Sequence, residues 1–213
     1  MEIKGKKVNF LGDSITEGYG VSAPEFKYVN VFAKKFEPAV VRNYGISGTR
    51  FAHQFVHVPG KPEKHDFDFC MRVKDMDPDA DIVIVYGGTN DFGSGDAPLG
   101  TPDDRTSETF WGACNFLMTS LIEKYPTAAI VFMTPLHRSV EDKENRPSLC
   151  EFVSIIKKAA EIYSIPVLDL YANAGICPQI EAQKIAYTKD GLHPNDAGAE
   201  KLADMLGKFL LSL

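Results

Sequence analysis

The sequence is poor in cysteine and has no long hydrophobic run. Its four cysteines lie far apart and form no C-x-x-C pair: Cys70, Cys114, Cys150 and Cys177. Buried free thiols fit this spacing better than a disulfide framework or a metal centre. No apolar stretch approaches membrane-spanning length, and the N-terminal MEIKGKKVNFLG lacks an apolar run long enough for a signal-peptide core. We therefore expect a cytoplasmic protein that has no membrane partner.

Clusters of basic residues are also absent. The net charge of −6 comes from scattered Asp and Glu, and no run rich in Lys or Arg interrupts them. This balance predicts no nucleic-acid partner, and it suits a small neutral or cationic ligand better than a polyanion. The length of 213 residues fits one domain, 1–213, without an internal repeat or a low-complexity linker. Nothing in the composition predicts an oligomeric state.

Five apolar segments of strand length alternate with segments of helical periodicity. The predicted strands are VNFLG (8–12), AVVRNYG (39–45), DIVIVYG (81–87), AAIVFMT (128–134) and IPVLDL (165–170). The predicted helices are 22–36, 108–125, 148–163 and a last helix that follows an Asn195 cap. Regular alternation of strand and helix predicts an α/β fold, a three-layer α/β/α sandwich built on a mostly parallel sheet.

Two further features concern a helix start and the loops. Segment 22–36 opens with Ser22 and Glu25 in capping-box spacing, so we expect its helix to begin there. Segments 46–80 and 88–107 are long for plain connections, which favours functional or mobile loops.

The first three predicted strands have polar, glycine-containing ends. These ends are Gly12-Asp13-Ser14, Asn43-Tyr44-Gly45 and Gly87-Gly88-Thr89-Asn90. In parallel sheets of this kind, ligands bind outside the carboxyl ends of the strands. We therefore expect the three ends to lie side by side and to form the functional site.

Ser14 is a candidate nucleophile, but a serine hydroxyl needs a neighbouring base, and that base needs a group that fixes its tautomer. Of the five histidines, only His193 has a nearby acid in a turn-forming context, because TKDGLHPND places Asp190 three residues before it. Such a turn can bring the carboxylate to Nδ1 of the ring and leave Nε2 for the serine. The simpler alternatives are Ser14 as a helix N-cap and the Asp190–His193 pair as part of a solvated turn.

Acyl transfer also needs hydrogen-bond donors for the developing oxyanion. The backbone N–H of Ser14 is one candidate, and the N–H of Gly48, in NYGISGTR, is a second because no side chain obstructs approach there. The side-chain amide of Asn90 is the third. Gly48 and Asn90 have an alternative reading as ordinary turn residues. We expect Asp13 to position the loop rather than to transfer protons.

Four blocks of the sequence resemble the signature blocks of the SGNH hydrolase superfamily, the GDSL-type esterases and lipases. They are GDSI (12–15), NYGISG (43–48), GGTND (87–91) and DGLHPN (190–195), in the order in which the family has them. Each block alone is weak, whereas four in order at strand ends are specific. The one departure is Ile15, where the name-giving motif has leucine, and that exchange conserves an apolar side chain.

The resemblance implies a flavodoxin-like sandwich with about five parallel strands in the order 2-1-3-4-5. It also implies hydrolysis of esters or thioesters with no metal and no organic cofactor. Matched block by block, it makes Ser14 the nucleophile and His193 and Asp190 the other triad members. The oxyanion hole would consist of Ser14, Gly48 and Asn90.

The predicted function is hydrolysis of short-chain, acetyl-type carboxylic esters, since the polar loop at 93–107 fits an open pocket better than an acyl tunnel. One alternative keeps this chemistry and makes the small-molecule substrate an acetylated carbohydrate. A second alternative, from a different class, is a non-catalytic flavodoxin-like module that binds phosphate at GDSITEG. Against that module, the sequence has no P-loop motif and no basic residue near Ser14.

Two roles are possible for each of the other histidines and for several aromatic residues. His53, His57 and His65 are candidate metal ligands, because the first two have helical spacing, but a stretch with Pro and Gly separates the third and favours an exposed loop. His137 follows the fourth strand and is either a substrate-rim residue or, more simply, solvated. Four aromatic residues either line a pocket or pack the loops: Tyr19, Phe51, Phe92 and Trp111.

Overall fold

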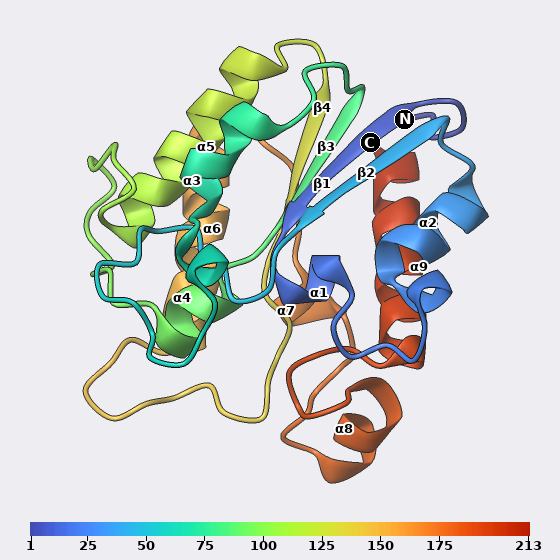
Figure 1. The fold of residues 1–213 in the computed structure, drawn as a ribbon. Helices are drawn as coiled ribbons and strands as arrows, with labels where there is room; N and C mark the ends of the chain where they lie inside the picture. Colours follow the sequence, from blue (N-terminus) through green and yellow to red (C-terminus); the bar gives the residue numbers. More distant parts are fainter.

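A five-stranded parallel sheet with the order β2-β1-β3-β4-β5 forms the centre of the computed structural model, which describes all 213 residues (Figure 1). The strands are β1 (Lys7–Gly12), β2 (Val40–Gly45), β3 (Ile82–Tyr86), β4 (Ala129–Met133) and β5 (Val167–Leu168). All four pairs of neighbouring strands are parallel. The predicted α/β class and the predicted strand order are confirmed.

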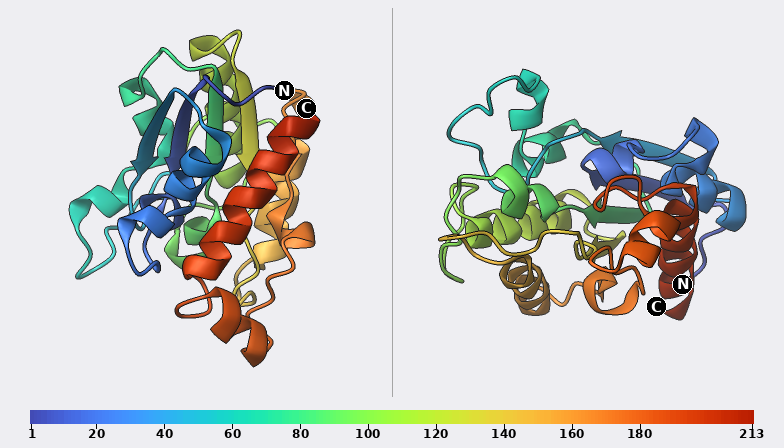
Figure 2. Two further views of the ribbon diagram at one scale, coloured as in Figure 1. Left: turned by 90° about the vertical axis from the view of Figure 1, so that its right-hand side faces the viewer. Right: turned by 90° about the horizontal axis from the view of Figure 1, so that it is seen from below.

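Helices cover both faces of the sheet and give the fold three layers (Figures 1 and 2). The helices are α1 (Ser14–Glu17), α2 (Tyr28–Phe36), α3 (Phe69–Arg72), α4 (Thr89–Ser94), α5 (Phe110–Lys124), α6 (Leu149–Ile162), α7 (Leu170–Asn173), α8 (Glu181–Tyr187) and α9 (Asp196–Ser212). Helices α3, α5 and α6 lie on one face, while α2 and α9 pack together on the other. Three short 3₁₀ turns complete the chain: η1 (Pro24–Phe26), η2 (Glu63–Asp66) and η3 (Val73–Asp75). No helix is both long enough and apolar enough to cross a membrane.

The strands send alternate side chains into two hydrophobic cores. Leu11, Val83 and Val85 belong to the core under α3, α5 and α6, whereas Phe10 and Ile84 belong to the core under α2 and α9. All five side chains are buried. Because both faces are covered, the central strands have continuous apolar sequences rather than alternating ones.

The first long helix begins later than the capping-box spacing predicts. Residues Pro24–Phe26 form η1, and α2 starts only at Tyr28. The N–H and hydroxyl of Ser22 instead donate to the carboxylate of Asp196, in the first turn of α9, at 2.8 and 2.6 Å. The predicted helix start was wrong because an acceptor 174 positions away takes the serine that would have capped the helix.

The last strand is shorter than predicted. Of the segment 165–170, only Val167 and Leu168 belong to the sheet. The carboxylate of Asp169 accepts the N–H of Ala172 at 3.1 Å and caps α7, so the chain turns into a helix directly after the strand.

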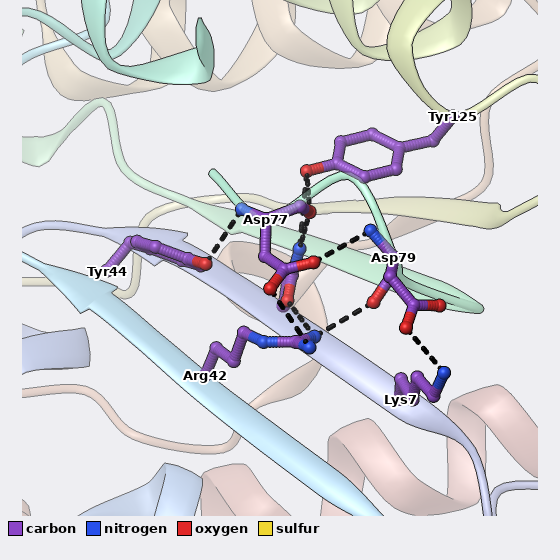
Figure 3. Close-up of polar contacts among 7 residues, drawn as sticks. Lys7, Arg42, Tyr44, Asp77, Asp79 and Tyr125 are labelled. Atoms are coloured by element: carbon purple, nitrogen blue, oxygen red, sulfur yellow. Dashed lines mark hydrogen bonds and ion pairs between the residues drawn. The ribbon is translucent and has the colours of Figure 1, made fainter. Parts of the chain in front are cut away.

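A polar network joins β1 and β2 to the loop before β3 (Figure 3). Asn9 is fully buried in β1; its Nδ2 donates to the Asp77 carbonyl at 2.8 Å and to the Tyr125 hydroxyl at 3.2 Å. Its Oδ1 accepts from Arg42 at 3.3 Å, and Arg42 forms an ion pair with Asp77 at 3.1 Å. We call this the edge network, and its members are Lys7, Asn9, Arg42, Tyr44, Asp77, Asp79 and Tyr125.

Candidate active site

The carboxyl ends of β1, β2 and β3 meet, as the sequence predicts. Gly12 is in register with Gly45 on one side and with Tyr86 on the other. Directly after β1, the Asp13 side chain accepts the N–H of Ile15 at 2.9 Å and caps α1, whose first residue is Ser14. The N-cap is therefore Asp13 and not Ser14, which leaves the serine hydroxyl free for another partner.

His193 lies in a tight turn just before α9. The turn closes through the Lys189 N–H, which donates to the His193 carbonyl at 2.8 Å, and through the Gly191 N–H, which donates to the Thr188 hydroxyl at 3.0 Å. Gly191 has a φ of +84°, which glycine adopts without strain. Asp190 Oδ1 accepts the backbone N–H of His193 at 2.8 Å. Hydrogen bonds within the turn thus hold the carboxylate beside the imidazole, and the Ser139 N–H adds a bond to the Gly191 carbonyl at 2.8 Å from outside it.

The fold brings this turn against the start of α1. Ser14 Oγ lies 3.0 Å from Nε2 of His193, and Nδ1 of the same ring lies 2.7 Å from Asp190 Oδ2. Ser14 and His193 are 179 positions apart in the chain. A hydroxyl, an imidazole and a carboxylate in this order can produce a serine nucleophile, because the carboxylate holds the proton on Nδ1 and leaves Nε2 as the proton acceptor.

Asp190 is kept ionised by its neighbours. Partial burial raises the pKa of its carboxyl, but hydrogen bonds from the backbone and the ring of His193 outweigh burial, so the pKa lies below its ordinary value. An ionised carboxylate at this place stabilises the imidazolium that forms when His193 accepts a proton.

Two of the three predicted oxyanion donors are unused backbone N–H groups. Those of Ser14 and Gly48 donate to no atom of the protein, and both residues border the same cavity. Gly48 has a φ of +78°, and a Cβ at this position would lie 2.3 Å from Nδ1 of His65. Glycine is therefore required both by the backbone conformation and by the imidazole that packs against it.

The third predicted donor, Asn90, is the second residue of α4 and borders the same cavity. Its Nδ2 donates to the Thr49 carbonyl at 3.0 Å and lies 3.5 Å from Asp13 Oδ2. One N–H of the amide is thus committed to Thr49, while the other can reach either Asp13 or a substrate oxygen. Burial raises the pKa of Asp13 to about 7, so its carboxyl is partly protonated at neutral pH and competes less for that N–H.

The cavity beside Ser14 has a volume of about 450 Å³ and a mostly polar lining. Only three lining residues are hydrophobic: Tyr19, Val58 and Leu192. Four others are basic: Arg50, Lys61, His65 and Arg138. The expectation that no basic residue lies near Ser14 was therefore wrong. No motif assigned these four side chains to the site, because they come from segments far from residue 14 in the chain. Three of them, Arg50, Lys61 and His65, lie in segment 46–80, which the sequence predicts to be functional or mobile.

The other histidines also pair with carboxylates, but none of them contacts a serine. His53 Nδ1 lies 3.3 Å from Asp68, and His57 Nδ1 lies 2.5 Å from Asp66. These two histidines lie outside any helix, so they share no helical face. The structure brings together no group of three His, Cys, Asp or Glu side chains suited to a metal ion.

His137 lies outside the cavity, in the segment after β4. Its Nδ1 lies 2.7 Å from Glu141, and its ring packs on Tyr171 with the centroids 3.8 Å apart. The Tyr171 hydroxyl donates to the same carboxylate at 2.8 Å. His137 is therefore neither a cavity-rim residue nor simply solvated; it belongs to a separate packed cluster.

The aromatic residues divide into one that borders the cavity and three that pack. The Tyr19 ring meets the His193 ring edge to face, with the centroids 4.5 Å apart. Phe51, Phe92 and Trp111 are buried in the core under α5 and α6.

The cysteines are all free, and two of them are buried. Burial raises the pKa of the Cys70 and Cys114 thiols well above the ordinary value, which makes both inert. Cys150 is exposed and Cys177 is partly exposed, so the expectation of buried thiols holds for only two of the four.

Similarity to known proteins extends over nearly the whole chain. The GDSL-like Lipase/Acylhydrolase family matches residues 10–201. A protein of known structure from Lactobacillus plantarum is 30% identical with a TM-score of 0.87, and the similarity covers 99% of this chain and 98% of that one. No protein with a curated description is significantly similar to the sequence.

Two further solved structures share the fold at lower identity. The lipase/acylhydrolase from Enterococcus faecalis is 21% identical with a TM-score of 0.66, over 96% of this chain and 95% of that one. The aryl esterase from M. smegmatis is 19% identical with a TM-score of 0.71, over 98% of this chain and 99% of that one.

Proposed function

Because the chain belongs to the GDSL-like lipase/acylhydrolase family, we propose that it is a serine esterase for short-chain, acetyl-type carboxylic esters with Ser14, His193 and Asp190 as its catalytic triad. One observation carries the proposal: an unbroken chain of hydrogen bonds runs from Ser14 Oγ through the His193 ring to Asp190. Two of the four sequence blocks, GDSI and DGLHPN, contain these three residues.

In the proposed mechanism, His193 Nε2 takes the proton of the Ser14 hydroxyl while Oγ attacks the carbonyl carbon of the ester. The resulting oxyanion accepts hydrogen bonds from the N–H groups of Ser14 and Gly48 and from the Asn90 amide. The imidazolium then donates its proton to the leaving alcohol as the C–O bond breaks. Water repeats the sequence on the acyl-enzyme, which releases the acid and restores Ser14.

The lining of the cavity supports small, polar substrates. Three hydrophobic residues among the fifteen that line it offer little surface for a long acyl chain. Acetyl esters need no such surface. An acetylated carbohydrate fits the same polar lining, so a carbohydrate O-acetylesterase is the narrower form of this proposal.

The non-catalytic phosphate-binding module is the alternative from another class. The basic residues around the cavity support this alternative, whereas the sequence argued against it because no basic residue lies near Ser14 in the chain. It assigns no role, however, to the contact between Ser14 and His193 or to the Asp190 carboxylate behind it.

Hydrolysis of p-nitrophenyl esters from acetyl to palmitoyl tests the proposal. The wild-type protein should turn over the acetyl and butyryl esters, and Ser14→Ala should lower kcat by a factor on the order of 10⁶, as removal of a triad nucleophile does. The matched control is Ser154→Ala, a serine on α6 that borders a different groove and should leave kcat unchanged.

Two outcomes would contradict the proposal. Turnover by Ser14→Ala at a rate near that of the wild type would overturn the assignment of the nucleophile. Absence of turnover at every chain length would favour the binding module, provided that circular dichroism shows the protein to be folded.

A further inference from the structure

The cavity beside Ser14 contains a buried arginine that forms no ion pair. Arg50 is only 3% exposed, and its Nη1 and Nη2 donate to the His65 carbonyl at 3.1 Å and to the Ser94 hydroxyl at 2.8 Å. Its Nε is enclosed without any partner. Burial lowers the pKa of this guanidinium, and the nearby carboxylates of Asp91, Asp66 and Asp96 oppose that shift without reversing it.

A second arginine, Arg138, borders the same cavity from the segment after β4. Its Nη1 donates to the carbonyl and the hydroxyl of Thr89 at 3.1 and 3.2 Å, and the guanidinium lies 5.2 Å from the centroid of the Phe92 ring. Its Nε and Nη2 make no hydrogen bond with the protein, and neither atom is fully enclosed. Arg138 therefore offers two unused donors on one planar group.

The buried Arg72 is an arginine whose hydrogen bonds serve only the fold, and it can be compared with Arg138. It donates to the carbonyls of Gly12 and Tyr44 and to the hydroxyl of Thr49, and it does not border the cavity. Its donors are used to join the ends of β1 and β2. Arg138 differs because two of its donors are left over.

The charges around the two arginines leave the cavity positive. Asp190 is the only carboxylate in the lining, and it already accepts from His193. Lys61, also in the lining, has no ion-pair partner. Other carboxylates lie near the arginines outside the lining. Asp91 and Asp96 near Arg50, and Glu141 and Asp13 near Arg138, accept hydrogen bonds from backbone N–H groups. Asp66, also near Arg50, contacts His57 through Oδ2, while its buried Oδ1 has no partner. This local excess of cations contrasts with a net charge of −6 for the whole chain.

We propose that the ester attacked by Ser14 carries an anionic group, a carboxylate, phosphate or sulfate, which binds to the free nitrogens of Arg138 with Arg50 and Lys61 beside it. This inference rests on the proposed function and narrows its substrate class. A guanidinium with two adjacent free N–H groups matches two oxygens of such an anion, and hydrogen bonds of this kind are stronger than neutral ones. Long, neutral acyl chains gain nothing from this lining.

Two matched pairs of esters test the proposal and show on which side of the scissile bond the anion lies. Mono-p-nitrophenyl fumarate is compared with methyl p-nitrophenyl fumarate, and 4-acetoxybenzoate with methyl 4-acetoxybenzoate. In each anionic ester the carboxylate is held too far from the scissile ester to attack it within the molecule. Each kcat/KM is divided by the rate of hydroxide hydrolysis of the same ester, which removes differences in intrinsic reactivity. In at least one pair we expect the anionic ester to be preferred by about tenfold or more, the effect of one charge-assisted hydrogen bond, and we expect added salt to reduce the preference.

The variant Arg138→Met should lower that preference by about 10- to 100-fold while the neutral ester of the pair changes little. Lys61→Met, on an exposed loop, should lower it less. Arg105→Met is the matched control, because Arg105 is exposed, donates only to nearby carbonyls and lies outside the cavity. Absence of a preference in both pairs, or an equal loss on anionic and neutral esters in Arg138→Met, would overturn the proposal.

A binding measurement separates this proposal from the proposed function. Titration calorimetry of both anionic esters into Ser14→Ala, which cannot form the acyl-enzyme, should show for at least one of them binding that the additional change Arg138→Met weakens. If wild-type protein hydrolyses no ester, the esterase proposal fails, and Arg138-dependent binding still supports the anion site. If neither anionic ester binds more tightly than its neutral partner, the anion site is overturned whatever the turnover.

Discussion

The edge network over β1 and β2 and the candidate active site beyond the end of β1 are both polar clusters in an otherwise apolar sandwich. In the edge network, both polar atoms of Asn9 have partners within the protein. In the candidate active site, the N–H groups of Ser14 and Gly48 and two nitrogens of Arg138 have none.

This difference distinguishes polar groups that stabilise the fold from polar groups that are available to a ligand. The unused donors of Ser14, Gly48 and Arg138 border one cavity, so they can bind a ligand there. Changes in the edge network should therefore lower the free energy of unfolding and leave turnover intact, whereas changes in the active site should do the reverse.

The largest effect should come from Asp190→Asn. An amide at this position can hold the wrong His193 tautomer and cannot stabilise the imidazolium, so kcat should fall by about 10⁴-fold. Thermal unfolding should change by only a few degrees, because the turn keeps its backbone hydrogen bonds. Steady-state kinetics on p-nitrophenyl acetate checks this, and a loss below tenfold would mean that Asp190 only shapes the turn.

Asn90→Ala should have the next largest effect. Removal of one oxyanion donor lowers kcat by about 10²–10³-fold and changes KM little. If Asn90 serves only to hold Thr49 and Asp13, the variant will instead unfold at a lower temperature with kcat within a few-fold of the wild type. The ratio of the change in kcat to the change in Tm separates the two roles.

Asn9→Leu should affect stability alone. The change leaves Arg42 and the loop carbonyl of Asp77 with fewer partners, which should lower the free energy of unfolding by about 1–3 kcal/mol. Urea titration measures this, and kcat should equal that of the wild type. As a control within the same network, Lys7→Met removes only an exposed ion pair with Asp79 and should cost less than about 1 kcal/mol.

The smallest effect is a pH dependence that arises from Asp13. Burial raises its pKa to about 7 in the folded protein, whereas in the unfolded chain it ionises near its ordinary value. Between these two values the folded state keeps a proton that the unfolded state has lost, so the stability contributed by Asp13 falls as pH rises through this window. Asp13→Asn does not titrate, so its Tm relative to the wild type should rise by a few degrees from pH 5 to pH 8. A difference in Tm that is the same at both pH values would contradict the prediction.

Much of the fold could be read from the sequence because it depends on local periodicity and turn chemistry. The continuous apolar runs of β1 and β3 require a sheet covered on both faces, and the order of strands and helices leaves few topologies. Asp190 and His193 lie beside each other because they are three positions apart in one tight turn. Ser14 was found for the same reason, since it ends a strand in a glycine-containing turn.

The errors in the prediction have two different physical causes. Ser22 was expected to cap a helix but instead bonds to Asp196, near the other end of the chain, so a distant partner replaced a local one. The last strand stops early because Asp169 caps α7 through Ala172, so here one local pattern replaced another.

The sequence by itself thus determined the α/β class and the residues proposed for the triad, because each depends on spacing within a short segment or on the ends of consecutive strands. The strand order came from the resemblance of four sequence blocks to a known family. Only the tertiary structure decided the character of the cavity. Arg50, Lys61 and Arg138 carry no motif and lie far from Ser14 in the chain, and the overall negative charge predicts the opposite environment. Electrostatic interactions depend on distance in space and not on separation in sequence, so the local field at Ser14 becomes known only when the loops are in place.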